Sequence, residues 1–206
     1  MFTNLIKYYN MNDFKISKRQ QEIIDCAGKI LSKSGISGLT TKNLASEMQF
    51  SESALYRHFK SKGKIIESML EYMAYDMDER LTKAIDSTRV PEQQFVALFT
   101  SQFEFFSENP HFVVAAFSDG LMEESQVINK AIKKIMAIKY KHLLPLLIAG
   151  QEQGLYNSKI EAKKLIHIVI GTFRLLMFKW RIDDFNFNIK KEGDKLIQTL
   201  LILMRQ

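Results

Sequence analysis

Residues 40–62 read TTKNLASEMQFSESALYRHFKSK, and their side chains have the types and spacing to do specific chemistry. Two short stretches with apolar residues at helical spacing, TKNLASEM and ESALYRHF, stand three residues apart. Hydroxyl, aromatic and basic side chains gather on the second stretch and just beyond it. Side chains of these kinds hydrogen-bond base edges and phosphate oxygens. The pattern therefore indicates a surface that contacts a nucleic acid.

Two helices of about eight residues joined by a turn of three or four form a helix-turn-helix, whose second helix faces the major groove. Such a unit needs an apolar inner face, supplied here by Leu44, Ala45, Met48, Leu55 and Phe59. Its outer face needs hydrogen-bonding side chains, which are Glu52, Ser53, Tyr56, Arg57 and Lys60. Its flanks must hold phosphates, for which Thr41, Lys42, His58 and Lys62 are placed. A generic helical hairpin rarely meets all three demands.

The longer stretch LTTKNLASEMQFSESALYRHFKSKGKII resembles the DNA-binding region of the TetR family of bacterial repressors. The matching elements are a threonine pair followed by a basic residue, an L-A pair, a serine cap and the pattern L-Y-x-H-F-x-S-K. The resemblance covers residues 18–68, and beyond them only the length and the helical pattern agree. It implies a sequence-specific, DNA-binding transcriptional regulator that binds a palindromic operator as a homodimer.

The resemblance also implies a role for each matching residue. Thr41 and Lys42 would begin the supporting helix and contact backbone phosphates. Phosphate anchors for the recognition helix would be Tyr56, His58 and Lys62. The positions that read base edges in the family fall on Glu52, Ser53 and Ala54, with Arg57 as an additional contact.

Two features depart from the family pattern. The usual A-G-V turn is replaced by Met48-Gln49-Phe50, so the turn lacks its glycine and Gln49 is expected to adopt a positive φ at some energetic cost. Glu52 brings a negative charge towards the groove. It either accepts a hydrogen bond from a cytosine amino group or interacts with the helix dipole, and the sequence leaves both roles open.

The elements around this unit are predicted to be helical throughout. Only 9 Gly and 3 Pro in 206 residues favour long helices, and no segment alternates at a period of two. We expect an all-α fold of about nine helices. The first would carry Ile23, Ile24, Ala27, Ile30 and Leu31 at helical spacing and end at Gly35, and the expected N-caps of the next three are Thr40 or Thr41, Ser51 and Ser61. Residues 1–15 would form an N-terminal arm without fixed structure, 16–63 a three-helix DNA-binding domain and 64–206 a larger helical domain for effector binding and dimerisation. Residues 1–10 are either part of that arm or the product of an upstream start before Met11.

The charge distribution agrees with this division. The formal net charge is +6, and all of the excess lies in residues 1–65, which hold 11 Lys/Arg and 5 Asp/Glu. Residues 66–206 hold 18 of each sign. A basic head on a neutral body suits a polyanionic partner. The alternative is a basic segment that serves only solubility.

Two apolar faces near the C-terminus are the expected dimer interface, because one helix-turn-helix covers too little DNA for high specificity. Gly171 would allow a close approach there. The resemblance implies a four-helix bundle, whereas the alternative is that these helices only fill their own core. The candidate interface residues are Leu165, Ile168, Val169, Thr172, Leu176, Trp180, Leu196, Leu200 and Leu203.

Phenylalanines at helical spacing in the second half are either core or the lining of an effector pocket. The resemblance implies that a small, mostly apolar or amphipathic effector binds inside the body and releases a repressor from its operator. The candidate lining residues are Gln102, Phe103, Phe106, His111, Phe117, Met122, Phe173, Arg174 and Met177.

Other chemistry finds little support in the sequence. His111, His142 and His167 have no metal-ligand spacing, no catalytic or cofactor motif is present, and Cys26 stands alone. We therefore expect no metal and no cofactor, and a protein that is not an enzyme. Neither a run of roughly 18–20 apolar residues nor a signal-like start is found, which predicts a cytoplasmic protein without a membrane partner. Two alternatives stay open: a DNA-binding protein with an architectural or cell-division role and no effector, and a small all-α enzyme.

Overall fold

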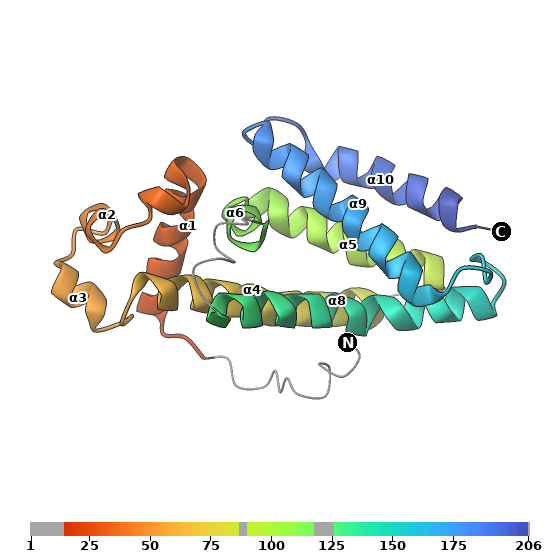
Figure 1. Ribbon diagram of the computed structural model, residues 1–206, viewed down its shortest axis with the longest axis horizontal. Helices are drawn as coiled ribbons and strands as arrows, with labels where there is room; N and C mark the ends of the chain where they lie inside the picture. Colours follow the sequence, from red (N-terminus) through yellow and green to blue (C-terminus); the bar gives the residue numbers. More distant parts are fainter. Residues whose placement is uncertain (1–14, 87–89, 118–125, 206) are drawn as a thin grey trace. The chain divides into compact units, whose positions relative to one another are not determined.

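The chain is described by a computed structural model over residues 15–86, 90–117 and 126–205. Every regular element in this part is a helix, which confirms the predicted fold class. The helices are α1 (Lys18–Gly38), α2 (Thr41–Glu47), α3 (Glu52–Tyr56), α4 (Lys62–Asp86), α5 (Pro91–Glu108), α6 (His111–Phe117), α8 (Gln126–Glu152), α9 (Ala162–Ile182) and α10 (Ile189–Met204) (Figure 1). None of these described helices is long and apolar enough to cross a lipid bilayer. The expected N-terminal arm lies outside the described residues except for Lys15.

The described residues form two compact units. The head unit comprises residues 15–75, 109–117 and 126–135, and the body unit comprises residues 76–86, 90–108 and 136–205. The head unit thus includes α6 and the first part of α4, although the sequence pattern suggested a division at residue 63. The reason is that α6 packs against α1, a contact between segments far apart in the chain.

The head unit is built around α1, which packs on both α2 and α6. Its buried face consists of Ile23, Ile24, Ala27 and Leu31, at the helical spacing expected from the sequence. The backbone leaves helical geometry at Gly35, where φ is 64°, so the predicted stop signal acts there although a further turn reaches Gly38.

Helices α1 and α6 approach closely because Gly28 has no side chain. A Cβ at this position would lie 2.4 Å from Cδ2 of His111, well inside contact distance. The imidazole also contacts the ring of Phe112 in a tilted arrangement, with 4.4 Å between the ring centroids. Burial lowers the pKa of His111, so the neutral ring is the form that this packing favours.

In the body unit, α10 packs on both α5 and α9. The backbone of α10 lies directly on an aromatic ring, because a Cβ on Gly193 would meet Phe103 at 2.4 Å. An ionic cluster around the buried Asp78 joins α4 to α8. The exposed Lys141 donates to both carboxylate oxygens of Asp78 at 2.9 Å, and Nε2 of the buried His142 lies 2.6 Å from Oδ1. Burial acts to raise the pKa of Asp78, but the hydrogen bonds from His142 and Lys141 outweigh it and hold this pKa below its ordinary value.

We expect Gly28→Ala to destabilise the protein by about 1–2 kcal/mol, since the added methyl group overpacks a filled site and displaces His111. The measurement is the urea midpoint followed by circular dichroism. Gly63→Ala is the matched control in the same unit, because a Cβ there would meet its nearest neighbour, Ser61 Oγ, at an ordinary 3.7 Å. Equal midpoints for the two variants would contradict the close α1–α6 contact.

Candidate nucleic-acid interface

Side-chain caps position the two short helices of the candidate interface. Thr40 Oγ1 accepts from the backbone N–H of Asn43 at 3.0 Å at the start of α2. Ser51 Oγ accepts from the N–H of Ala54 at 3.2 Å at the start of α3. Ser61 Oγ accepts from the N–H of Lys64 at 3.2 Å at the start of α4. All three caps are among those the sequence predicts, and each satisfies a backbone donor that has no partner inside its helix.

The turn between α2 and α3 has the geometry expected from its missing glycine. Gln49 adopts φ 56°, which confirms that a non-glycine residue occupies the left-handed region here. The N–H of Phe50 donates to the carbonyl of Ala45 at 2.8 Å and closes the turn. The guanidinium of Arg19 lies 4.2 Å from the Phe50 ring centroid and covers the turn from α1.

Helix α3 is shorter than predicted. It ends at Tyr56 rather than near residue 59, and Arg57 is its C-cap. The backbone nevertheless continues to coil, because the N–H of Phe59 donates to the carbonyl of Leu55 at 3.1 Å. Leu55 and Phe59 are both buried, so these side chains pack the segment onto the rest of the head unit.

The predicted DNA-contacting residues divide by exposure. Exposed side chains are those of Lys42, Glu52, Ser53, Tyr56 and Arg57, whereas Thr41, Ala54, His58 and Lys62 are half-buried. All of them lie on α2, α3, the segment after α3 and the first residue of α4. The structure therefore brings together hydroxyl, aromatic and basic side chains on one short stretch of the head unit.

Glu52 has a partner that the sequence did not indicate. Thr41 Oγ1 donates to Glu52 Oε2 at 2.9 Å, and this bond links the starts of α2 and α3. Ser53 is also engaged locally, since its hydroxyl lies 2.9 Å from that of Ser51. Both pairs are exposed. The carboxylate of Glu52 is thus held at the N-terminus of α3, where its charge also complements the helix dipole.

Two side chains of α1 support the interface and were missed by the sequence analysis. Gln20 Nε2 donates to the backbone carbonyl of His58 at 3.4 Å, and Arg19 stacks on Phe50. Both contacts tie α1 to the segments around α3. Helical periodicity places Gln20 and Arg19 on polar positions and carries no signal for partners more than 30 residues away.

Two family models match consecutive parts of the chain. The model described as bacterial regulatory proteins, tetR family, matches residues 23–69. The model described as YsiA-like protein, C-terminal region, matches residues 70–203, which is more than half of the chain. The chain belongs to the TetR family. It is therefore a DNA-binding transcriptional regulator, and the described surface around α3 is its candidate DNA interface.

Relatives and solved structures agree with this membership. The chain is 27% identical over 167 residues to the nucleoid occlusion factor SlmA of Shewanella halifaxensis, covering 81% of this chain and 82% of that protein. It is 28% identical over 177 residues to SlmA of Vibrio vulnificus, covering 84% and 89%. Among solved structures, FadR of Bacillus halodurans, a fatty acid degradation regulator, matches with a TM-score of 0.81 at 15% identity over 91% of this chain and 97% of that one. KstR2 of Mycobacterium tuberculosis, a ketosteroid transcriptional regulator, matches with a TM-score of 0.79 at 19% identity over 93% and 97%.

The residues predicted to line an effector pocket are only partly brought together. Phe103, Phe106, Phe173 and Met177 are buried in the body unit, and the rings of Phe103 and Phe106 lie 5.3 and 6.1 Å from that of Phe173. Gln102 is buried on α5 and Arg174 is exposed on α9. His111 and Phe117 belong to the head unit instead. Met122 lies outside the described residues.

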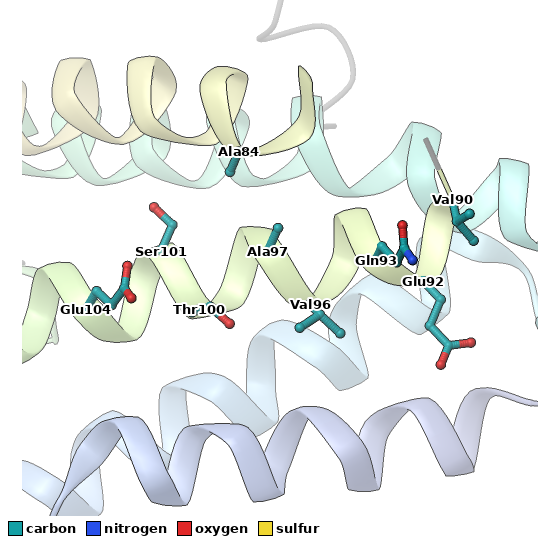
Figure 2. A pocket seen from close by; sticks show the side chains of 9 residues that line it. All are labelled: Ala84, Val90, Glu92, Gln93, Val96, Ala97, Thr100, Ser101 and Glu104. Atoms are coloured by element: carbon teal, nitrogen blue, oxygen red, sulfur yellow. The ribbon is translucent and has the colours of Figure 1, made fainter. Parts of the chain in front are cut away.

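An open groove of about 630 Å³ also lies along α5 in the body unit. Its lining residues are Ala84, Val90, Glu92, Gln93, Val96, Ala97, Thr100, Ser101 and Glu104. Figure 2 shows Ala84 pointing from α4 towards α5, with Ala97 and Ser101 pointing back. None of the predicted pocket residues lines this groove.

The predicted dimer residues lie on two different sides of α9 and α10. Leu165, Val169, Trp180 and Leu200 are buried within the chain, whereas Ile168 and Leu203 are 52% and 67% exposed. Thr172, Leu176 and Leu196 are half-buried. The sequence analysis did not include four further exposed apolar side chains on these helices, which are Leu175, Phe178, Ile182 and Ile202.

Replacing Glu52 by glutamine tests its role at the interface. We expect Glu52→Gln to raise affinity for all duplexes alike, by about threefold to tenfold, because the carboxylate is held by Thr41 and its negative charge repels phosphates. Base preference in a selection from random duplexes should stay unchanged. Loss of a preference for one C·G pair would instead show that Glu52 accepts from a cytosine amino group.

Proposed function

We propose that this TetR-family regulator is a repressor that binds a palindromic operator as a homodimer and is released by a small, mostly apolar effector. The carrying observation is the exposed set of hydroxyl, aromatic and basic side chains on α3 and its flanks. The caps at Thr40, Ser51 and Ser61 support it, because they fix where each short helix starts. Operator binding takes place in the cytoplasm.

The homodimer proposal rests on the exposed apolar face of α9 and α10. Ile168, Leu175, Phe178 and Ile182 are separated by seven, three and four residues, which places them along one side of α9. Ile202 and Leu203 extend this exposed apolar surface on α10. A helix face of this kind normally packs against another protein surface. Gly171 is exposed, and a Cβ there would meet nothing within 4 Å in the part of the chain that the structure describes, so a partner helix could approach closely.

The effector proposal rests on the aromatic interior of the body unit and on the family. A ligand shifts the equilibrium between two states only by its difference in affinity for them, and about 3 kcal/mol changes operator affinity by roughly 150-fold. A second function is favoured by the SlmA relatives, whose name describes nucleoid occlusion. In that case the chain would bind DNA without an effector, and no small molecule would change operator occupancy.

Selection of bound fragments from genomic DNA tests the proposed function. We expect palindromic sites and an affinity that falls steeply with salt. Lys42→Ala should weaken operator binding by about threefold to tenfold and reduce the salt slope by about 1, since it removes one phosphate contact. Lys133→Ala, an exposed change on α8, is the control and should leave both unchanged. A selection without any enriched sequence would refute the proposal.

The dimer interface is tested by the double variant Leu175→Glu/Ile182→Glu. Two buried carboxylates facing an apolar partner cost several kcal/mol, so we expect a monomer in sedimentation velocity and weak operator binding. Ile148→Glu introduces the same charge at an exposed apolar position of α8 and should stay dimeric. A double variant that sediments as a dimer would place the interface elsewhere.

A further inference from the structure

The body unit contains a buried aromatic cluster centred on Phe173 of α9. Three rings from α5 surround it, with centroid separations of 5.7 Å for Phe99, 5.3 Å for Phe103 and 6.1 Å for Phe106. These rings are buried. An interior of this kind is normally completed by apolar side chains alone, so any polar group within it calls for a physical reason.

Gln102 is such a polar group. It lies on α5 three residues after Phe99 and four before Phe106, which places it on the helix face that carries those two rings. The side chain is only 2% exposed, and among the described residues neither its amide nitrogen nor its amide oxygen has a hydrogen-bond partner. Burying an unsatisfied amide is unfavourable. Recognition of a ligand by this amide would explain why a polar side chain occupies this apolar interior.

Lys139 of α8 is the second polar group at the cluster. It is buried, and its Nζ lies 4.5 Å from the centroid of the Phe173 ring. Burial, with a contribution from Arg174, lowers the pKa of Lys139 to about 8. The ammonium group at neutral pH is therefore maintained against a desolvation cost, which its contact with the aromatic face offsets in part.

The chemistry of the two groups selects one class of ligand. An ammonium group and an amide N–H₂ both donate hydrogen bonds, and donors of this kind match the oxygens of a carboxylate. The surrounding rings match an apolar body. A ligand pocket typically combines such apolar walls with a few polar groups that fix orientation. A cationic amphiphile would instead meet the like charge of Lys139.

We propose that Lys139 and Gln102 hold the carboxylate of an effector whose remainder is apolar and packs among the rings around Phe173. This inference rests on the proposed function, since it names the chemical class of the effector. Lys139 was absent from the pocket residues expected from the sequence, whereas Gln102, Phe103, Phe106 and Phe173 were among them.

The pH dependence follows from the charge that binding requires. Protonated Lys139 binds a carboxylate through a charge-assisted hydrogen bond, which the neutral amine does not provide. In the free protein this lysine loses its proton around pH 8. Carboxylate affinity should therefore be constant below pH 7 and fall by about tenfold per pH unit above pH 8, until the pKa of the complex is reached. A neutral ligand with the same apolar body should show no such fall.

The experiment compares octanoate, 1-octanol and octylamine by isothermal titration calorimetry on the full chain. We expect octanoate to bind most tightly at pH 7 and to lose its advantage over 1-octanol at pH 9.5. Lys139→Met should weaken octanoate by about 10- to 100-fold and leave 1-octanol unchanged, because the charged hydrogen bond is lost while the apolar contacts remain. Gln102→Leu should weaken octanoate to a smaller extent. Lys133→Met is the matched control and should bind as the unaltered chain does.

Each outcome decides the inference. Equal binding of octanoate and 1-octanol, no binding of octanoate, or an undiminished octanoate affinity in folded Lys139→Met and Gln102→Leu would overturn it. Thermal melts of the variants establish that they fold. Operator binding is measured separately by fluorescence anisotropy. A chain that binds its operator but not octanoate refutes this inference alone, whereas a chain that binds octanoate but no operator refutes only the proposed function.

Discussion

The short length of α2 and α3 is the constraint on which the DNA-binding surface depends. Helices of seven and five residues are not stable in water by themselves. The unfavourable free energy of helix nucleation exceeds the stabilisation from so few backbone hydrogen bonds. Both are stabilised from outside. Caps from Thr40 and Ser51 satisfy the first backbone donors, and Leu44 and Leu55 are buried in the head unit. The outward side chains are therefore positioned by the caps and by the buried face of each helix.

The same constraint explains how much of this surface could be predicted from the sequence. Caps and buried positions are local signals, so Thr40, Ser51, Leu44 and Leu55 were recognised from residue type and spacing. The positive φ of Gln49 was also predictable, because the resemblance identified a turn that ordinarily contains glycine. Contacts across long stretches of sequence were not. Arg19 on Phe50, Gln20 on His58 and Thr41 on Glu52 depend on where the helices meet, which no local pattern encodes.

Helix α9 shows why the dimer face could be predicted only in part. Apolar residues occur around most of its circumference: Leu165, Val169 and Trp180 on the inner side and Ile168, Leu175 and Ile182 on the exposed side. Hydrophobic periodicity detects one apolar stripe on an otherwise polar helix. When two stripes are present, the spacing alone does not say which one faces the chain's own core. The burial of each side chain in the structure distinguishes the two stripes. The exposed stripe is the one that a partner could contact.

Two buried ionisable sites in the body unit differ in a way that bears on function. Asp78 accepts hydrogen bonds from Lys141 and His142. These bonds favour the charged form of Asp78 despite its burial, as in other buried ion pairs that remain ionised. Lys139 lies against Phe173, and burial instead works against its charge. Gln102 of α5 has an amide without a hydrogen-bond partner among the described residues. Removing a partner from the first site leaves a charge uncompensated, whereas an anion at the second would accept a hydrogen bond from the Gln102 amide and attract the Lys139 ammonium group. The first arrangement therefore stabilises the fold, and the second is the one suited to recognise a ligand.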